Sequence, residues 1–228
     1  MTTAVQSSWV ALVGNPNSGK TAIFNLLTGL NQKVSNYPGV TVEKKTGQAR
    51  FADGSKFYIL DLPGTYSLTA ESMDERIVTE QVLNWIHGHE PPGIIVSVVD
   101  ATNLSRNLYL TTQLADLGIP VVVALNMMDM VKDEIKIDLE KFANDLDIVA
   151  IVPMSATEKW GQKELLEAVQ KSIDTAFVEN PFPIFLNDDI SKVLNPLEEI
   201  FKSQLRYNER LAKAQALRLV TRQSTLEI

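Results

Sequence analysis

Residues 14–21 read Gly14-Asn15-Pro16-Asn17-Ser18-Gly19-Lys20-Thr21, a complete GxxxxGK(S/T) pattern. An apolar run at residues 9–13 precedes this stretch and a helix-like run at 22–27 follows it, so we expect a loop between a strand and a helix. The two glycines let successive backbone N–H groups turn toward an anion at the positive end of the helix. Lys20 adds a cation for the β- and γ-phosphates, and the Thr21 hydroxyl is a ligand for Mg²⁺. The stretch predicts a chain that binds a nucleoside triphosphate.

The composition restricts the classes of protein that fit. With 228 residues, the chain is long enough for one large domain and a smaller one. Its net charge of −7 argues against nucleic acid as a partner. No apolar stretch approaches the roughly 18 residues that a membrane-spanning helix needs. The absence of cysteine from the sequence excludes disulfides and thiolate metal sites.

Apolar strand-like runs alternate with helical stretches, which predicts an α/β fold with a mostly parallel sheet flanked by helices. The expected buried strands are residues 9–13, 94–99, 121–125 and 148–152. Residues 46–51 and 56–60 flank Asp53-Gly54 and predict a hairpin. Helices are expected at 72–86, 104–117 and 162–177. One hairpin in an otherwise parallel sheet is typical of the small-GTPase type of P-loop NTPase.

The stretch Glu179-Asn180-Pro181-Phe182-Pro183 breaks the helical pattern and indicates a linker. We therefore expect a nucleotide-binding domain over residues 1–178 and a small all-helical domain over 179–228. Two helices are expected in the latter, at about 189–205 and 207–221. The first has an apolar stripe with too little partner surface in this chain, so we expect the helical domain to be incomplete.

A second motif, Asp61-Leu62-Pro63-Gly64, follows the expected strand at 56–60. Its carboxylate would hold Mg²⁺ through water, and the Gly64 amide would meet the γ-phosphate. Thr41, in the loop before the hairpin, would complete the metal shell. Taken alone, DxxG is also a common turn and Thr41 a surface threonine. The expected Mg²⁺ ligands are thus Thr21, Thr41 and Asp61.

The third motif, Asn126-Met127-Met128-Asp129, follows the expected strand at 121–125, at the edge where open α/β sheets bind ligands. Asp129 would accept hydrogen bonds from N1–H and the 2-amino group of guanine, which adenine lacks. Asn126 would brace the base and the phosphate-binding loop. Ser155-Ala156 would offer a backbone N–H to the guanine carbonyl. Alone, NxxD is more often an Asx-turn, but the order of the motifs predicts guanine as the base.

Two positions depart from the usual GTPase pattern. Met127 replaces the lysine of NKxD, which predicts modest affinity and quick GDP release. Thr65 follows Gly64 where many GTPases place a water-orienting glutamine, which predicts slow intrinsic hydrolysis. In GTPases with asparagine at the position of Asn17, the expectation is a monovalent cation such as K⁺ in place of an arginine finger. We expect Lys20, Asn17, Thr41 and Gly64 to carry catalysis.

The loop GNPNSGKT, the segment Asn36-Tyr37-Pro38-Gly39-Val40-Thr41-Val42-Glu43, and the DLPGTYSL and NMMD motifs together resemble the cytosolic N-terminal part of the bacterial ferrous-iron transporter family FeoB. The resemblance covers the whole nucleotide-binding domain, and the helical tail is similar to that family's spacer, which inhibits nucleotide dissociation. The residues then expected to bind guanine nucleotide are Gly14, Asn15, Pro16, Asn17, Ser18, Gly19, Lys20, Thr21, Gly39, Val40, Thr41, Asp61, Gly64, Asn126, Met127, Asp129, Ser155 and Ala156.

The resemblance implies a place at the cytoplasmic face of the bacterial inner membrane and regulation of ferrous-iron uptake through a permease domain that this chain lacks. It implies small Feo accessory proteins as further partners and leaves a homo-oligomer open. The competing hypothesis is a soluble GTPase in ribosome or tRNA maturation, which shares the GxPNxGK(S/T) loop. The acidic charge and the missing lysine of NKxD argue against it. A third hypothesis, a binding switch with negligible turnover, differs only in rate.

Overall fold

The computed structural model describes residues 9–69, 72–131, 138–174 and 187–221. The chain divides into two compact units: one of residues 1–115 and 119–177, and one of residues 116–118 and 178–228. The expectation that these units correspond to two domains, 1–178 and 179–228, stays a prediction.

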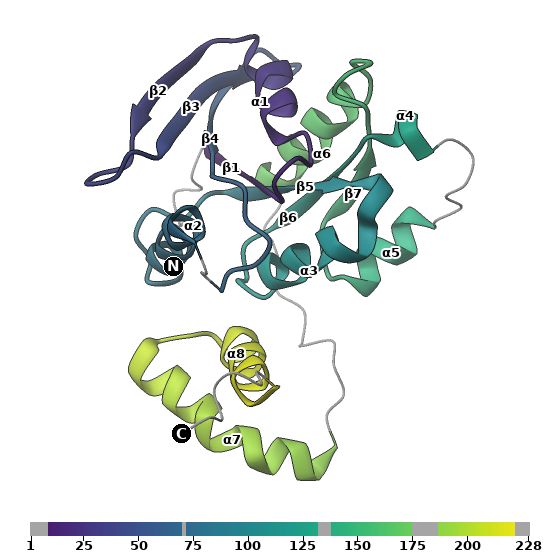
Figure 1. Ribbon diagram of the computed structural model, residues 1–228. Helices are drawn as coiled ribbons and strands as arrows, with labels where there is room; N and C mark the ends of the chain where they lie inside the picture. Colours follow the sequence, from purple (N-terminus) through teal and green to yellow (C-terminus); the bar gives the residue numbers. More distant parts are fainter. Residues whose placement is uncertain (1–8, 70–71, 132–137, 175–186, 222–228) are drawn as a thin grey trace. The chain divides into compact units, whose positions relative to one another are not determined.

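The first unit is built on a seven-stranded sheet in the order β2-β3-β4-β1-β5-β6-β7 (Figure 1). Strand β1 pairs in parallel with β4 and β5, and the parallel pairing continues through β6 to β7, while β2, β3 and β4 pair antiparallel. The predicted mostly parallel sheet and its hairpin of β3 and β4 are therefore confirmed, whereas the antiparallel pairing of β2 with β3 is an addition to the prediction. The strands are β1 (Trp9–Gly14), β2 (Gln32–Asn36), β3 (Glu43–Arg50), β4 (Lys56–Asp61), β5 (Ile94–Asp100), β6 (Val121–Asn126) and β7 (Ala150–Pro153).

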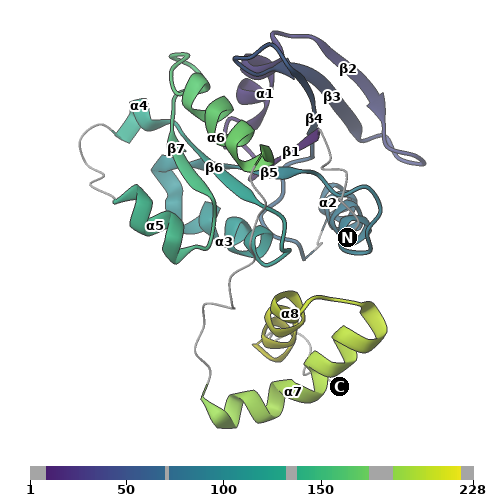
Figure 2. The same ribbon diagram turned by 180° about the vertical axis from the view of Figure 1, so that it is seen from behind.

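Helices cover both faces of this sheet. Helices α1 and α6 lie on one face, whereas α3 and α5 lie on the other (Figures 1 and 2). The buried hydroxyls of Ser97 and Thr111 are 2.8 Å apart and join β5 to α3. Ser72 and Glu75 form the predicted capping box at the start of α2. The helices are α1 (Lys20–Thr28), α2 (Met73–Ile86), α3 (Leu104–Ala115), α4 (Met128–Val131), α5 (Leu139–Asp145) and α6 (Gln162–Asp174).

The structure adds one strand that the sequence pattern does not predict. Strand β2 (Gln32–Asn36) is exposed along its whole length and has one large apolar residue, Val34. An edge strand with no buried face lacks the alternation that identifies strands in sequence. It pairs only with β3, so it forms the outer edge of the sheet.

The central strands are buried on both faces, as their continuous apolar character predicts. Because β1, β4, β5, β6 and β7 run in parallel, their carboxyl ends lie at one edge of the sheet. The phosphate-binding loop follows β1, the DxxG motif begins at the end of β4, and the NxxD motif begins at the end of β6. The fold thus brings motifs that are far apart in sequence to a common edge.

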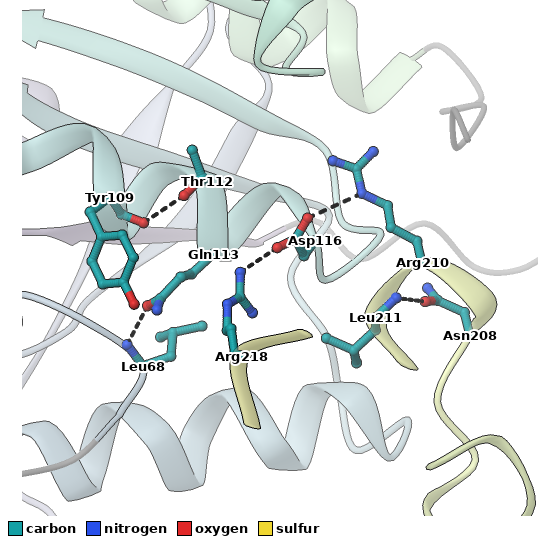
Figure 3. A network of polar contacts seen from close by, with 9 residues as sticks. All are labelled: Leu68, Tyr109, Thr112, Gln113, Asp116, Asn208, Arg210, Leu211 and Arg218. Atoms are coloured by element: carbon teal, nitrogen blue, oxygen red, sulfur yellow. Dashed lines mark hydrogen bonds and ion pairs between the residues drawn. The ribbon is translucent and has the colours of Figure 1, made fainter. Parts of the chain in front are cut away.

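The second unit contains α7 (Asp188–Leu205) and α8 (Glu209–Thr221), together with the short segment Asp116–Gly118. The Asp116 carboxylate accepts from Arg210 Nε at 3.4 Å and from Arg218 Nη2 (Figure 3). Burial raises the pKa of Asp116, and the two guanidinium groups oppose that shift. This charge cluster joins the segment Asp116–Gly118 to α8 within the unit.

Helix α7 keeps part of its apolar stripe exposed. Val193 is 59% exposed, and Ile190 and Ile200 are also exposed, whereas Leu194 is fully buried. The incompleteness of the helical domain stays a prediction. Within the described ranges, none of the helices is long and apolar enough to cross a bilayer.

Candidate functional site

The phosphate-binding loop between β1 and α1 lines one side of the candidate site. Ser18 donates from its backbone N–H and from its hydroxyl to the Asn15 carbonyl, at 3.2 and 2.9 Å. Gly19 is the N-cap of α1 at φ +86°, and a β-carbon there would lie 2.1 Å from Asn126 Nδ2. Only glycine fits both the backbone angle and this close approach. The loop therefore places the N-terminus of α1 toward the adjoining cavity.

Two adjoining cavities meet at this loop. The first has a volume of about 500 Å³ and is lined by Asn15, Pro16, Asn17, Gly19, Lys20, Thr21, Ala22, Gly64 and Asp74. The second has a volume of about 430 Å³ and is lined by Lys20, Thr21, Thr41, Val42, Glu43, Lys45, Asp61, Leu62, Pro63, Gly64 and Asp74. Four residues border both, so the cavities form one continuous site. Thr21, Thr41 and Asp61, the expected Mg²⁺ ligands, all border the second cavity, and their hard oxygen donors suit that ion.

Lys20, which borders both cavities, forms an ion pair with Asp61, which borders the second. Their side chains are only 10% and 4% exposed. Burial raises the pKa of Asp61, and the positive charges of Lys20 and Lys45 oppose this shift. Lys20 is expected to bind the phosphates of a metal–polyphosphate, and Asp61 is expected to bind the metal ion. Both groups can bind only if their ion pair breaks.

The segment from Tyr37 to Val42 forms a tight turn. Tyr37 donates from its backbone N–H to the Val42 carbonyl at 3.0 Å and accepts from the Val40 N–H at 3.3 Å. The turn brings Thr41 to the second cavity, whereas Gly39 and Val40 line neither cavity. Burial and the nearby Asp61 charge raise the pKa of Tyr37 to about 12. Its buried hydroxyl has no hydrogen-bond partner among the residues that the structure describes.

Gly64 lies against the phosphate-binding loop. A β-carbon at this position would be 3.1 Å from Cα of Pro16, so a side chain would push the two loops apart. The next residue, Thr65, is fully buried. Its N–H donates to the Gly14 carbonyl at 3.2 Å, and its hydroxyl donates to the Ser67 carbonyl at 2.6 Å. The Thr65 hydroxyl is thus bound inside the protein, and Thr65 lines neither of the two cavities.

Asn126 joins two loops through both ends of its buried side-chain amide. Its Nδ2 donates to the Ser18 carbonyl at 3.0 Å, and its Oδ1 accepts from the Ala156 N–H at 3.0 Å. Ser155 exchanges two backbone hydrogen bonds with Trp160, both at 3.2 Å. Residues 155–160 therefore form a closed turn that is fixed to the phosphate-binding loop through Asn126.

Met127 and Asp129 follow at the same edge. Met127 has a left-handed backbone, with φ +63°, and its terminal carbon lies 3.7 Å from the β-carbon position of Gly19. Asp129 stands in the first turn of α4 and is partly exposed. Across the described ranges, its carboxylate has no hydrogen-bond or ion-pair partner, which leaves both oxygens ready to accept from a ligand.

The structure also shows residues that the sequence patterns do not assign to the site. Asp74 lines both cavities from the first turn of α2. Glu75 Oε1 lies 3.4 Å from the Thr65 hydroxyl and 3.5 Å from the Tyr66 amide nitrogen. In the sequence Glu75 is explained by the capping box and Asp74 is one acid in the first turn of the expected helix, so neither pattern points to the cavities. A larger cavity of about 930 Å³ lies elsewhere, beside Tyr58, Leu60 and Gln81, and contains none of the expected site residues.

Comparisons with known proteins agree with this geometry. A sequence family described as ferrous iron transport protein B matches residues 8–169. The chain is 44% identical over 206 residues to the Fe(2+) transporter FeoB of Methanocaldococcus jannaschii, covering 89% of this chain and 30% of that protein. The curated relatives that we compared extend well beyond it, since the chain spans only 21% to 30% of their length.

Solved structures show the same likeness. The chain is similar to the cytosolic domain of L. pneumophila FeoB, with 40% identity and a TM-score of 0.78 over 92% of this chain and 86% of that one. It is also similar to a mutant of S. thermophilus NFeoB bound to GDP, with 39% identity and a TM-score of 0.76 over 93% of this chain and 78% of that one.

Proposed function

This chain belongs to the ferrous iron transport protein B family, and on that premise we propose that it binds GTP and hydrolyses it to GDP and phosphate. The observation that carries the proposal is the meeting of the motif residues Lys20, Thr41, Asp61 and Gly64 at two adjoining cavities. The family and the GDP-bound relative support guanine nucleotide as the ligand.

The polyphosphate would lie along the N-terminus of α1. There the loop N–H groups and the helix dipole favour an anion, and Lys20 borders both cavities. Thr21, Thr41 and Asp61 would hold Mg²⁺, which supplies charge neutralisation for the bound phosphates. The Gly64 N–H would donate to the γ-phosphate. Thr41 and Gly64 would then respond together to the loss of that phosphate.

The base would lie beside Met127 and Asp129. The carboxylate of Asp129 matches the two donors of guanine, and adenine would leave it unpaired in a partly buried place. The turn at residues 155–156 would contribute a backbone N–H to the guanine carbonyl. Met127 covers this region with an apolar side chain where other GTPases have a lysine, which supports modest affinity and quick GDP release.

Hydrolysis would be slow without a further cation. Because the Thr65 hydroxyl donates to the Ser67 carbonyl, it does not take the place of a water-orienting glutamine. Asn17 is exposed at the rim of the first cavity, and its side-chain oxygen suits a monovalent cation. We place K⁺ there, beside the phosphates.

In the full-length protein, we place this chain at the cytoplasmic face of the membrane, where nucleotide-dependent changes at Thr41 and Gly64 would regulate ferrous-iron uptake by the permease part. The membership of the chain in a transporter family supports this role over one in ribosome or tRNA maturation.

We expect Asp61→Asn to uncouple nucleotide affinity from magnesium. Without Mg²⁺, GDP must draw Lys20 away from Asp61 and leave a buried carboxylate near the phosphates. Removing that charge should tighten binding of GDP in EDTA by about tenfold, or about 1.4 kcal/mol, and reduce the gain from added Mg²⁺. Titration of a fluorescent GDP analogue with and without Mg²⁺ measures both. Asp145→Asn, an exposed acid on α5 that lines neither cavity, is the matched control and should keep the wild-type response to Mg²⁺. An Asp61→Asn variant with the wild-type magnesium response would contradict the separation of Lys20 from Asp61 on nucleotide binding.

Potassium should speed hydrolysis through Asn17. Phosphate release by the wild type should be at least about tenfold faster in KCl than in NaCl. This acceleration is much smaller than the one that an arginine finger supplies. Asn17→Ala should hydrolyse GTP equally slowly in both salts, whereas Asn84→Ala, an exposed asparagine on α2, should keep the difference. Equal wild-type rates in the two salts would remove Asn17 from this role.

The coupling to transport is tested in the full-length protein with Asp129→Asn. The loss of the guanine-accepting carboxylate should reduce guanine-nucleotide affinity by about tenfold or more, and ferrous-iron uptake by cells should fall with it. Asp145→Asn, an exposed acid on α5, should leave uptake unchanged. Undiminished uptake by Asp129→Asn would reject the coupling.

A further inference from the structure

Helix α3 holds the loop that follows Gly64. The Leu68 N–H donates to Gln113 Oε1 at 2.6 Å (Figure 3). Gln113 is 1% exposed although it is polar, so this hydrogen bond satisfies a buried amide that would otherwise destabilise the fold. The loop is thus fixed at its far end to the last turn of a packed helix.

The first turn of α3 holds the near end of the same loop. The guanidinium carbon of Arg106 lies 4.0 Å from the ring centroid of Tyr66, a close cation–π contact. The backbone carbonyl of Arg106 accepts from Asn15 Nδ2 at 3.4 Å. Arg106 therefore contacts the loop after Gly64 with its side chain and the phosphate-binding loop with its backbone.

The two contacts share one side of α3. Gln113 lies seven positions after Arg106, which is close to two helical turns, or about 10 Å along the axis. The helix itself is fixed to the sheet, since Thr111 contacts the Ser97 hydroxyl at 2.8 Å and Asn107 Oδ1 accepts from the Asp100 N–H at 3.3 Å. A helix anchored in this way can hold Tyr66 and Leu68 in fixed places.

We propose that Arg106 and Gln113 are positioning residues for GTP hydrolysis, which act by holding the loop of residues 65–69 so that the Gly64 amide stays at the γ-phosphate. This inference rests on the proposed function. Gly64 packs directly against Pro16, so a small movement of the following loop shifts its amide relative to the phosphate-binding loop. Displacement of a reacting group by about 1 Å can lower a rate by up to about a hundredfold.

The proposal predicts a particular split between binding and turnover. Tyr66, Leu68, Arg106 and Gln113 line neither cavity. Their loss should therefore leave the affinity for GDP nearly unchanged, because GDP lacks the γ-phosphate that the Gly64 amide meets. It should slow the hydrolysis step. A contact that only stabilised the fold would change binding and turnover together.

The test measures single-turnover GTP hydrolysis at saturating enzyme, together with the dissociation constant for a fluorescent GDP analogue. Gln113→Met, which removes the acceptor but keeps the size, and Tyr66→Leu, which removes the ring, should each lower the rate by about tenfold. Their GDP affinity should stay within about twofold of the wild type. Two controls should retain the wild-type rate. Tyr66→Phe keeps the aromatic ring, and Tyr109→Leu removes an exposed ring on α3 other than the one over which Arg106 lies.

A double variant separates the ring contact from other effects. If Arg106 acts through Tyr66, Arg106→Ala combined with Tyr66→Leu should be no slower than Tyr66→Leu alone. In nucleotide-free protein, the Leu68 amide should exchange its hydrogen slowly, and Gln113→Met should accelerate that exchange. This second measurement tests the contact without using nucleotide.

Wild-type hydrolysis rates in both Gln113→Met and Tyr66→Leu, with normal GDP affinity, would overturn the proposal. Equal losses of GDP affinity and turnover would overturn it too, because they indicate a structural role. If Gln113→Met does not fold, the Tyr66→Leu variant still tests the proposal, because Tyr66 is partly exposed. A wild-type chain without any GTP turnover would instead contradict the proposed function, and this inference with it.

Discussion

The side-chain amide of Asn126 ties the phosphate-binding loop to the turn at residues 155–156, and the arrangement of the whole site depends on it. Its donor and its acceptor are both used, at 3.0 Å each, and it is 3% exposed. A buried amide with both ends satisfied is fixed in orientation. The loops after β1, β6 and β7 are therefore held in fixed positions relative to one another. The regions expected to bind the base and the phosphates are thus held at a fixed distance from each other.

A second constraint comes from charge. Lys20 and Asp61 are nearly buried and neutralise each other, because an isolated buried charge would cost several kcal/mol. A bound metal–polyphosphate offers each of them a new partner of opposite sign. We therefore expect ligand binding to separate this pair and to move the DxxG and phosphate-binding loops together. The contacts of α3 to the loop after Gly64 extend this linkage beyond the residues that line the cavities.

Local sequence signals predict much of this structure. The strands β1, β5 and β6 follow from apolar runs because they are buried on both faces, and the start of α2 follows from its capping box. The phosphate-binding loop and the DxxG and NxxD motifs are short patterns at strand ends, so their common edge follows once the sheet is parallel. Strand β2 could not be predicted, because an exposed edge strand carries no periodic apolar signal.

Other features depend on contacts between distant parts of the chain. The pairing of Lys20 with Asp61 and the approach of Gln113 to Leu68 join residues that are 41 and 45 positions apart. Asp74 and Gly64 line the same two cavities although they belong to different elements. In the sequence, Gln113 is one polar residue in an amphipathic helix and Asp74 is one acid in the first turn of a helix. Neither residue type nor spacing distinguishes them from solvent-facing residues.

The central claim is that this edge of the sheet selects guanine nucleotides. Isothermal titration calorimetry on the chain in Mg²⁺ buffer tests it most directly, with GDP and ADP as the two titrants. We expect saturable heat with GDP and none with ADP at the same concentration, because only guanine offers two donors to Asp129. Equal heats for the two nucleotides, or no heat with GDP, would contradict it.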